Sequence, residues 1–252
     1  MLKLVDRSTA RFHIDEADRY AVRCVFVGRP DGPDADVLID GELVGHVATR
    51  AASVAPLPPP DLGTIGLTRG EHALELRVAA RAWLGFDSIA FDSAAPFVRA
   101  WWIAPPVPAS AQGSVEEAPP GEALWLAPTF DPGAAGWREL PETDEHLDLN
   151  RLVSASAPVL GYLMTFVHAA EAATVRARLG SDDGARVWVN GQLVWSHALH
   201  RPFTADEDRF DVPLAAGWNR VLVKVRNDDG GYAMSLRLAD PSGRLHAATR
   251  AQ

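Results

Sequence analysis

The most informative segment of the sequence is Val187-Trp188-Val189-Asn190-Gly191-Gln192-Leu193-Val194. Runs of β-forming residues flank an Asn-Gly pair there, and both central positions of a type I′ turn need positive φ, so the segment predicts a β-hairpin. An earlier segment, Val37-Leu38-Ile39-Asp40-Gly41-Glu42-Leu43-Val44, has the same pattern with Asp-Gly at the turn. The sequence therefore predicts two hairpins of one kind.

A second pair of matching segments follows the two hairpins. Gly70 precedes an alternating apolar strand at 74–78, and Gly217 precedes another at 221–225. Two matches in the same order and at nearly the same offset indicate a duplicated structural unit.

Alternation of apolar and polar residues continues through most of the chain, for example in 175–179 and 234–238. Together with 20 glycines and 19 prolines, it indicates short strands with one buried face. Helical patterns are confined to Glu116-Glu117 and the stretch from Thr143 to Leu152. We therefore predict an all-β chain of two tandem antiparallel β-sandwich domains, at residues 1–95 and 96–252.

Residues 104–121 are rich in Pro, Ala and Ser. This composition disfavours regular structure and predicts an exposed connector or long loop. The apolar run before it, 97–103, is predicted to be a strand that opens the second domain.

Charge limits the partners that this chain can have. Its 252 residues carry a formal net charge of -9, and a phosphate backbone or an anionic membrane surface would repel such a chain at long range. We therefore expect no nucleic-acid partner and no membrane partner, and a neutral ligand is favoured. The N-terminal residues contain no apolar core of signal-peptide length, and no stretch approaches a membrane span. The single cysteine, Cys24, alternates onto an apolar face, which predicts a buried thiol and not a nucleophile.

Four further motifs lie in the second half: Tyr162-Leu163-Met164-Thr165, Gly180 to Gly191, Ala216 to Asn219 and Val223-Lys224-Val225. Together they resemble a galactose-binding-like β-sandwich of the jelly-roll type, a module that recurs beside the catalytic domains of bacterial glycoside hydrolases. The Ser181-Asp182-Asp183-Gly184 turn also resembles the protective-antigen-type sugar-binding domain. The first half, less specifically, resembles a module found toward the ends of large bacterial carbohydrate-active proteins. These resemblances imply carbohydrate binding in a secreted or cell-surface setting; the sequence alone leaves a cytoplasmic one open.

The paired carboxylates of Asp182 and Asp183 are candidate metal ligands. In some adhesins of the protective-antigen type such a pair holds a calcium ion that in turn ligates sugar hydroxyls. Adjacent carboxylates in a turn supply the hard oxygen atoms that calcium prefers, and Asn190 or a backbone carbonyl could complete the shell. The alternative is an Asx-type turn, because a tight loop selects Asp and Gly in any case.

Trp188, Trp195 and Trp218 are candidate sugar platforms, since an indole can stack on the apolar face of a pyranose. Alternation with Val187 and Val189 places Trp188 on the face opposite the core. The alternative is that a loop or the other domain covers it, because most tryptophans are largely buried.

The loop between the hairpin and residue 209 carries His197, His200 and Arg201, which could donate hydrogen bonds to sugar hydroxyls. Tyr232 could line the same rim. The two histidines also have a spacing that can ligate zinc, but no third ligand stands at a suitable distance in the sequence. The alternative is that these side chains are simply solvated.

The leading interpretation is a non-catalytic carbohydrate-binding or accessory protein for a neutral glycan, with or without an attached catalytic domain. The sequence contains no nucleophile elbow, no zinc-protease motif and no phosphate-binding loop. Two alternatives stay open. One is a structural module that forms homo-oligomers or other protein contacts. The other is a small glycoside hydrolase, whose two carboxylates only the fold could bring together.

Overall fold

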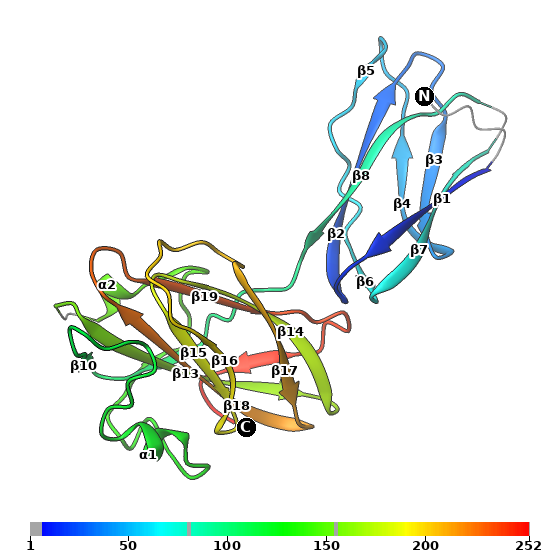
Figure 1. Cartoon of the computed structure of the whole chain (residues 1–252). Helices are drawn as coiled ribbons and strands as arrows, with labels where there is room; N and C mark the ends of the chain where they lie inside the picture. Colours follow the sequence, from blue (N-terminus) through cyan, green and yellow to red (C-terminus); the bar gives the residue numbers. More distant parts are fainter. Residues whose placement is uncertain (1–6, 80–81, 154–155, 252) are drawn as a thin grey trace. The chain divides into compact units, whose positions relative to one another are not determined.

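The computed structural model describes residues 7–79, 82–153 and 156–251, and it is all-β, with 53% of these residues in strands and 4% in helices. The predicted all-β class is confirmed. The chain divides into two compact units (Figure 1): unit 1 comprises Met1–Ala95 and Asp240–Gly243, and unit 2 comprises Pro96–Ala239 and Arg244–Gln252. Neither helix in the described part of the chain has the length and hydropathy that crossing a bilayer requires.

Unit 1 contains two antiparallel sheets around one apolar core. The first sheet has the order β1-β7-β3-β4, and in the second β2 pairs with β5, β6 and β8. Buried side chains from both sheets, among them Phe26, Ile39 and Leu76, form the core. The strands are β1 (Arg7–Ile14), β2 (Asp18–Gly28), β3 (Asp34–Ile39), β4 (Glu42–Ala48), β5 (Ala55–Pro56), β6 (Thr64–Leu67), β7 (Gly70–Val78) and β8 (Gly85–Ser93).

Cys24 lies fully buried in this core, and burial raises the pKa of its thiol to about 12. At neutral pH the group is therefore protonated and unreactive, as the sequence pattern predicted.

A buried histidine closes the β3–β4 turn of unit 1. His72 Nδ1 lies 2.6 Å from Asp40 Oδ2, and its Nε2 lies 2.8 Å from the Thr68 carbonyl oxygen. Burial lowers the pKa of His72, but the hydrogen bonds to Asp40 and Thr68 outweigh it, so the pKa is raised overall. Burial likewise raises the pKa of Asp40, and the partner imidazole and the Ala73 N–H reverse that shift to a net lowering.

One end of the chain contributes to unit 1 through the segment Asp240–Gly243. Asp18 is fully buried, and its carboxylate accepts hydrogen bonds from the Asp240 N–H at 3.2 Å and from the Ser93 hydroxyl at 2.5 Å. A carboxylate with this burial and these partners ties the late segment into the early sheet.

Unit 2 contains a larger pair of antiparallel sheets. The eight-stranded sheet has the order β11-β9-β13-β18-β15-β16, with β10 and β20 also paired to β13, and the four-stranded sheet has the order β12-β19-β14-β17. The elements are β9 (Trp101–Ile103), β10 (Val107–Pro108), α1 (Glu122–Leu126), β11 (Arg138–Leu140), β12 (Leu147–Asp148), α2 (Leu149–Leu152), β13 (Val159–Ala169), β14 (Ala173–Ser181), β15 (Ala185–Val189), β16 (Gln192–His197), β17 (Asp208–Leu214), β18 (Gly217–Asn227), β19 (Ala233–Leu238) and β20 (His246–Ala248).

The helix expected between Thr143 and Leu152 is present as α2. The helix expected at Glu116-Glu117 is wrong: Glu116 lies in a turn, Glu117 has no regular secondary structure, and α1 begins later, at Glu122.

The two predicted hairpins are confirmed, and the units share the three-strand element around them. β3 pairs with both β4 and β7, and β15 pairs with both β16 and β18. Asp40 and Asn190 have φ of 51° and 52°, as type I′ turns require. The Asp40 Oδ1 atom accepts the Ala73 N–H at 2.8 Å, and Asn190 Oδ1 accepts the Arg220 N–H at 2.9 Å. The same kind of side-chain bond therefore closes both turns.

The outer face of the eight-stranded sheet is covered by residues 104–137, here called the cover segment. An aromatic cluster joins the two: Trp125 lies 4.6 Å from Tyr162 and 5.5 Å from Trp137, measured between ring centroids. Trp102 and Trp188 belong to the same cluster. The predicted connector at 104–121 is thus part of a segment folded back onto unit 2, and in Figure 1 α1 (green) lies outside the sheets.

Alternate residues of β18 anchor the cover segment. Val221, Val223 and Val225 face the core between the sheets, so the residues between them face outward. Three outward cations donate to backbone carbonyls of the cover segment: Arg220 to Leu126 and Ala127, Lys224 to Glu117, and Arg226 to Ser110. Lys224 Nζ also lies 2.5 Å from the Glu122 carboxylate, with Lys224 fully buried. Burial lowers the pKa of Lys224, and the Glu122 carboxylate opposes that shift.

Candidate functional site

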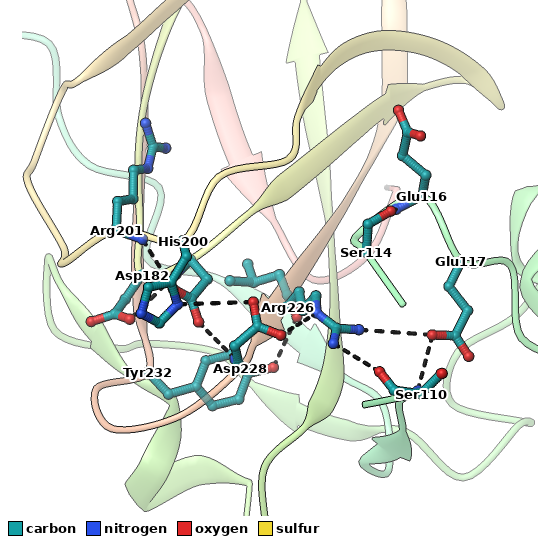
Figure 2. Close-up of polar contacts among 12 residues, drawn as sticks. Ser110, Ser114, Glu116, Glu117, Asp182, His200, Arg201, Arg226, Asp228 and Tyr232 are labelled. Carbon is teal, nitrogen blue, oxygen red and sulfur yellow. Dashed lines mark hydrogen bonds and ion pairs between the residues drawn. The ribbon is translucent and has the colours of Figure 1, made fainter. Parts of the chain in front are cut away.

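Three loops of unit 2 meet beside the end of β18. They are the β14–β15 turn (182–184), the β16–β17 loop (198–207) and the β18–β19 turn (228–232). The buried carboxylate of Asp183 joins them: its Oδ1 accepts the Arg201 N–H at 3.0 Å, and its Oδ2 accepts the Asp228 N–H at 2.6 Å. Figure 2 shows Asp182, His200 and Asp228 close together where the three loops meet.

A cluster of potential ligand atoms results from this convergence. His200 Nδ1 lies 2.8 Å from Asp183 Oδ1 and 3.9 Å from Asp228 Oδ2. One ligand atom from each of these residues lies within 4.8 Å of the others. The side chain of Asp183 is 1% exposed, whereas those of Asp228 and His200 are 35% and 63% exposed. The cluster therefore has a rigid buried base and an accessible rim.

Asp182 lies beside the cluster, and its pKa reflects that position. Burial, and then the charge of the neighbouring Asp183, raise the pKa of Asp182. A Cβ atom on Gly231 would lie 2.3 Å from Asp182 Oδ2, so only glycine leaves room for this carboxylate at the turn. We refer to Asp182, Asp183, His200 and Asp228 as the loop site.

The donor set of the loop site suits a divalent cation. Carboxylate oxygens are the ligands that calcium prefers, and an imidazole is more typical of zinc or copper. Asn190, the third ligand expected from the sequence, does not lie here. It is at the far end of β15, five strand residues or about 16 Å from the Asp183 turn, and its amide donates to Asn219 Oδ1 at 2.8 Å.

Arg201 and His197 lie next to the loop site but face a different partner. The Arg201 guanidinium donates to both oxygens of Asp208, at 3.1 and 2.5 Å, and His197 Nδ1 lies 3.0 Å from the same carboxylate. Burial raises the pKa of Asp208, but the hydrogen bonds from Arg201 and His197 outweigh it and lower it overall. With 9% of its side chain exposed, Arg201 holds the loop in place and has little surface for a ligand.

The expected aromatic residues do not gather at the loop site. Trp188 faces away from the sandwich core, as alternation predicted, but it is 4% exposed beneath the cover segment, which is the alternative foreseen for it. Trp195 stacks on Phe210 at 4.9 Å, against the core. Tyr232 is 3% exposed and donates its hydroxyl to the Val225 carbonyl.

Trp218 lies at the opposite end of β18 from Asp228. The intervening residues of the strand separate them by about 30 Å. Its indole is half-buried, with its ring centroid 5.2 Å from that of His168 and 6.0 Å from that of His246. Trp218 therefore cannot contact the same sugar ring as the loop site.

Asp228 is the ligand candidate that sequence reasoning missed. A signal was present, because Asp182-Asp183-Gly184 and Asp228-Asp229-Gly230 are two copies of the same turn motif.

Asp228 also connects the loop site with the cover segment. Its Oδ1 lies 2.6 Å from Arg226 Nε, and the same guanidinium donates to the Ser110 carbonyl and lies 3.7 Å from Glu117 Oε2 (Figure 2). One carboxylate of the loop site is thus oriented by a cation that also holds the cover segment.

No family model matches the sequence, and no curated protein matches it. The PA14 sugar-binding domain from an RTX adhesin is 18% identical with a TM-score of 0.30, over 61% of this chain and 72% of that one. An anti-sigma factor domain-containing protein from Clostridium clariflavum is 14% identical with a TM-score of 0.32, over 97% and 82%. The apo lectin of Pleurotus ostreatus is 12% identical with a TM-score of 0.31, over 97% and 75%. Likenesses at this level carry no argument about function.

Proposed function

We propose that unit 2 binds a neutral glycan at the loop site, without catalysis, and that a calcium ion shared by Asp183 and Asp228 forms part of that site. The observation that carries the proposal is the convergence of three loops on one cluster of carboxylate and imidazole atoms. The motif resemblance of the 181–184 turn to sugar-binding domains supports the ligand class. The net charge of -9 favours a neutral ligand over an anionic one.

The chain's own groups have separate roles in this proposal. Asp183 forms the base, because backbone N–H groups from two loops fix both of its oxygens. Asp228 and His200 form the accessible rim, where a carboxylate accepts and an imidazole donates hydrogen bonds to sugar hydroxyls. Calcium supplies positive charge among the carboxylates and coordination positions for neighbouring hydroxyls. The binding energy of such an exposed site is modest, with dissociation constants on the order of micromolar to millimolar.

A glycan array probed with the full chain, once in calcium and once in EDTA, tests the proposal. We expect binding to a restricted set of neutral glycans that weakens at least about tenfold in EDTA. Flat responses to all glycans under both conditions would overturn the glycan assignment, and glycan binding unchanged by EDTA would overturn the calcium assignment.

A matched pair of variants assigns the binding to the loop site. Asp228→Asn removes a cluster carboxylate, whereas Asp229→Asn changes an exposed neighbour outside the cluster. We expect Asp228→Asn to weaken glycan binding about tenfold and Asp229→Asn to leave it within about twofold. Equal affinities for the two variants would remove the loop site from the proposal.

A further inference from the structure

A hollow of about 370 Å³ lies on the outer face of the eight-stranded sheet, away from the loop site. Phe166, one of its lining residues, pairs across the sheet with Arg220, near the start of β18, whereas Asp228 follows the end of that strand. Eight residues of strand correspond to about 26 Å, so the two sites cannot share one small ligand. The volume falls within the range of roughly 300 to 1,000 Å³ that is usual for small-molecule pockets.

The lining combines an aromatic base with a polar rim. Trp102 is buried and Phe130 and Phe166 are half-buried, which places these three rings at the base. Asp131 and Arg250 are exposed and stand at the rim. The rim therefore offers an acceptor group at Asp131 and a donor group at Arg250.

The wall formed by the end of the chain is held in place by hydrogen bonds. The Trp102 indole N–H donates to the Thr249 carbonyl at 2.6 Å, and the Thr249 hydroxyl donates to Glu139 Oε1 at 2.5 Å. Arg250 donates to the other oxygen of Glu139 at 3.0 Å. The hydrogen bond from its indole N–H to Thr249 thus fixes Trp102 in the wall of the hollow.

The opposite wall belongs to the cover segment and is equally well fixed. Asp131 Oδ1 accepts the N–H groups of Gly133 and Ala134, at 2.9 and 3.2 Å. A Cβ atom on Gly133 would lie 3.3 Å from Trp102 Cη2, so the backbone of this turn passes close to the indole ring. Both walls are therefore preformed, which keeps the entropic cost of binding low.

An acceptor and a donor at the rim favour a ligand that both donates and accepts hydrogen bonds. The net charge of -9 favours a neutral ligand over an anionic one. The aromatic base favours a ligand that also has an apolar face. A pyranose ring has both properties, with C–H groups on its faces and hydroxyls around its edge.

We infer that this hollow, here called the sheet-face pocket, is a second glycan site that takes one neutral pyranose ring. The ring stacks on Phe130 and Phe166, the two half-buried aromatic side chains of the lining, and its hydroxyls bond to Asp131 and Arg250. The ligand class in this inference rests on the proposed function, whereas the location of the pocket does not. One chain then has two separate sugar-binding sites. Each site is weak alone, but a polysaccharide that occupies both is bound more tightly than by either one.

Titration of the ¹⁵N-labelled full chain with methyl glycosides of glucose, galactose, mannose and N-acetylglucosamine tests the inference. We expect at least one glycoside to shift the indole N–H resonance of Trp102, with a dissociation constant in the millimolar range. Ala134→Trp fills the sheet-face pocket, and Ala135→Trp, in the same turn but outside the lining, is the matched control. The first variant should weaken this binding about tenfold and the second should leave it within about twofold.

The Asp228→Asn variant separates this inference from the proposed function. If Asp228→Asn abolishes all glycoside binding and Ala134→Trp changes none, the proposed function stands and the sheet-face pocket is overturned. If only Ala134→Trp weakens glycoside binding, the sheet-face pocket is supported and glycan binding at the loop site is overturned. Independent partial losses in the two variants support both sites, and no shift with any glycoside in the unaltered chain overturns both.

Discussion

Replacing Lys224 by Met is expected to destabilise unit 2 by about 3 kcal/mol, because it leaves a buried carboxylate without its cation. Lys224 is fully buried, and Glu122 is 6% exposed. The Glu122 carboxylate receives the ammonium at 2.5 Å and the Tyr162 hydroxyl at 2.6 Å. After the substitution only the Tyr162 bond of these two remains. Breaking such a pair by removing one partner costs about 3 to 5 kcal/mol, and we take the lower figure because Tyr162 still donates.

The double variant Lys224→Met/Glu122→Gln tests whether the pair itself is responsible. A neutral amide can keep the Tyr162 hydrogen bond, so we expect the double variant to lie within about 1.5 kcal/mol of the unaltered chain. If Glu122→Gln alone also costs about 3 kcal/mol, the two single costs together exceed the cost of the double variant by at least about 3 kcal/mol. That excess is the favourable coupling free energy between the two positions. Glu116→Gln, an exposed change in the same segment, is the control and should cost less than about 0.5 kcal/mol.

Urea unfolding followed by tryptophan fluorescence gives these free energies. Every tryptophan except Trp83 belongs to unit 2, so the fluorescence transition reports that unit. A cost below about 1 kcal/mol for Lys224→Met, or a double variant whose cost equals the sum of the single ones, would refute the buried-pair account.

Three further predictions concern the turns and unit 1. Gly41→Ala and Gly191→Ala both place a side chain at positive φ, which costs about 1 to 2 kcal/mol; Gly191→Ala should cost more, because its Cβ would lie 2.8 Å from the Leu126 carbonyl oxygen while Gly41 faces open space. Equal costs in urea unfolding would contradict this. Asp40→Asn keeps the turn but removes the charge beside His72, so the stability difference from the unaltered chain should be largest between about pH 4 and 6.5. The stability that the His72–Asp40 pair contributes is lost as pH rises through the raised pKa of His72, and it is also lost as pH falls through the lowered pKa of Asp40. A stability difference that is independent of pH in thermal melts would exclude this coupling. Cys24 should react with a disulfide reagent at pH 8 only as fast as unit 1 opens, because its thiol is buried with a raised pKa, and rapid labelling of the folded chain would disprove its burial.

The local patterns of the sequence were enough for the strands and turns. Alternation and the Asp-Gly and Asn-Gly pairs predicted both hairpins and the outward direction of Trp188, because these features depend only on residues close in the chain. The position of the cover segment could not be predicted in the same way. Its anchors are backbone carbonyls, such as those of Ser110 and Leu126, and every residue has a carbonyl whatever its side chain.

The loop site was predictable only in part for a similar reason. The Asp182-Asp183 turn is visible in the sequence, but its partner Asp228 lies in another turn, and only the sheet pairing brings the two together. Asn190 is near this turn in the sequence but not in space. A single strand separates it from the turn in space, since a strand carries the chain about 3.3 Å per residue in one direction.

The segment Asp240–Gly243 has a consequence for how the protein is made. The sheets of unit 1 are complete by residue 95, yet the Asp240 N–H that bonds the buried Asp18 carboxylate is translated only after β19. A nascent chain therefore leaves the ribosome with its first sandwich assembled but still short of one internal hydrogen bond. That bond forms only after residue 240 has been synthesised, so the N-terminal half gains it later than the hydrogen bonds within its own sheets.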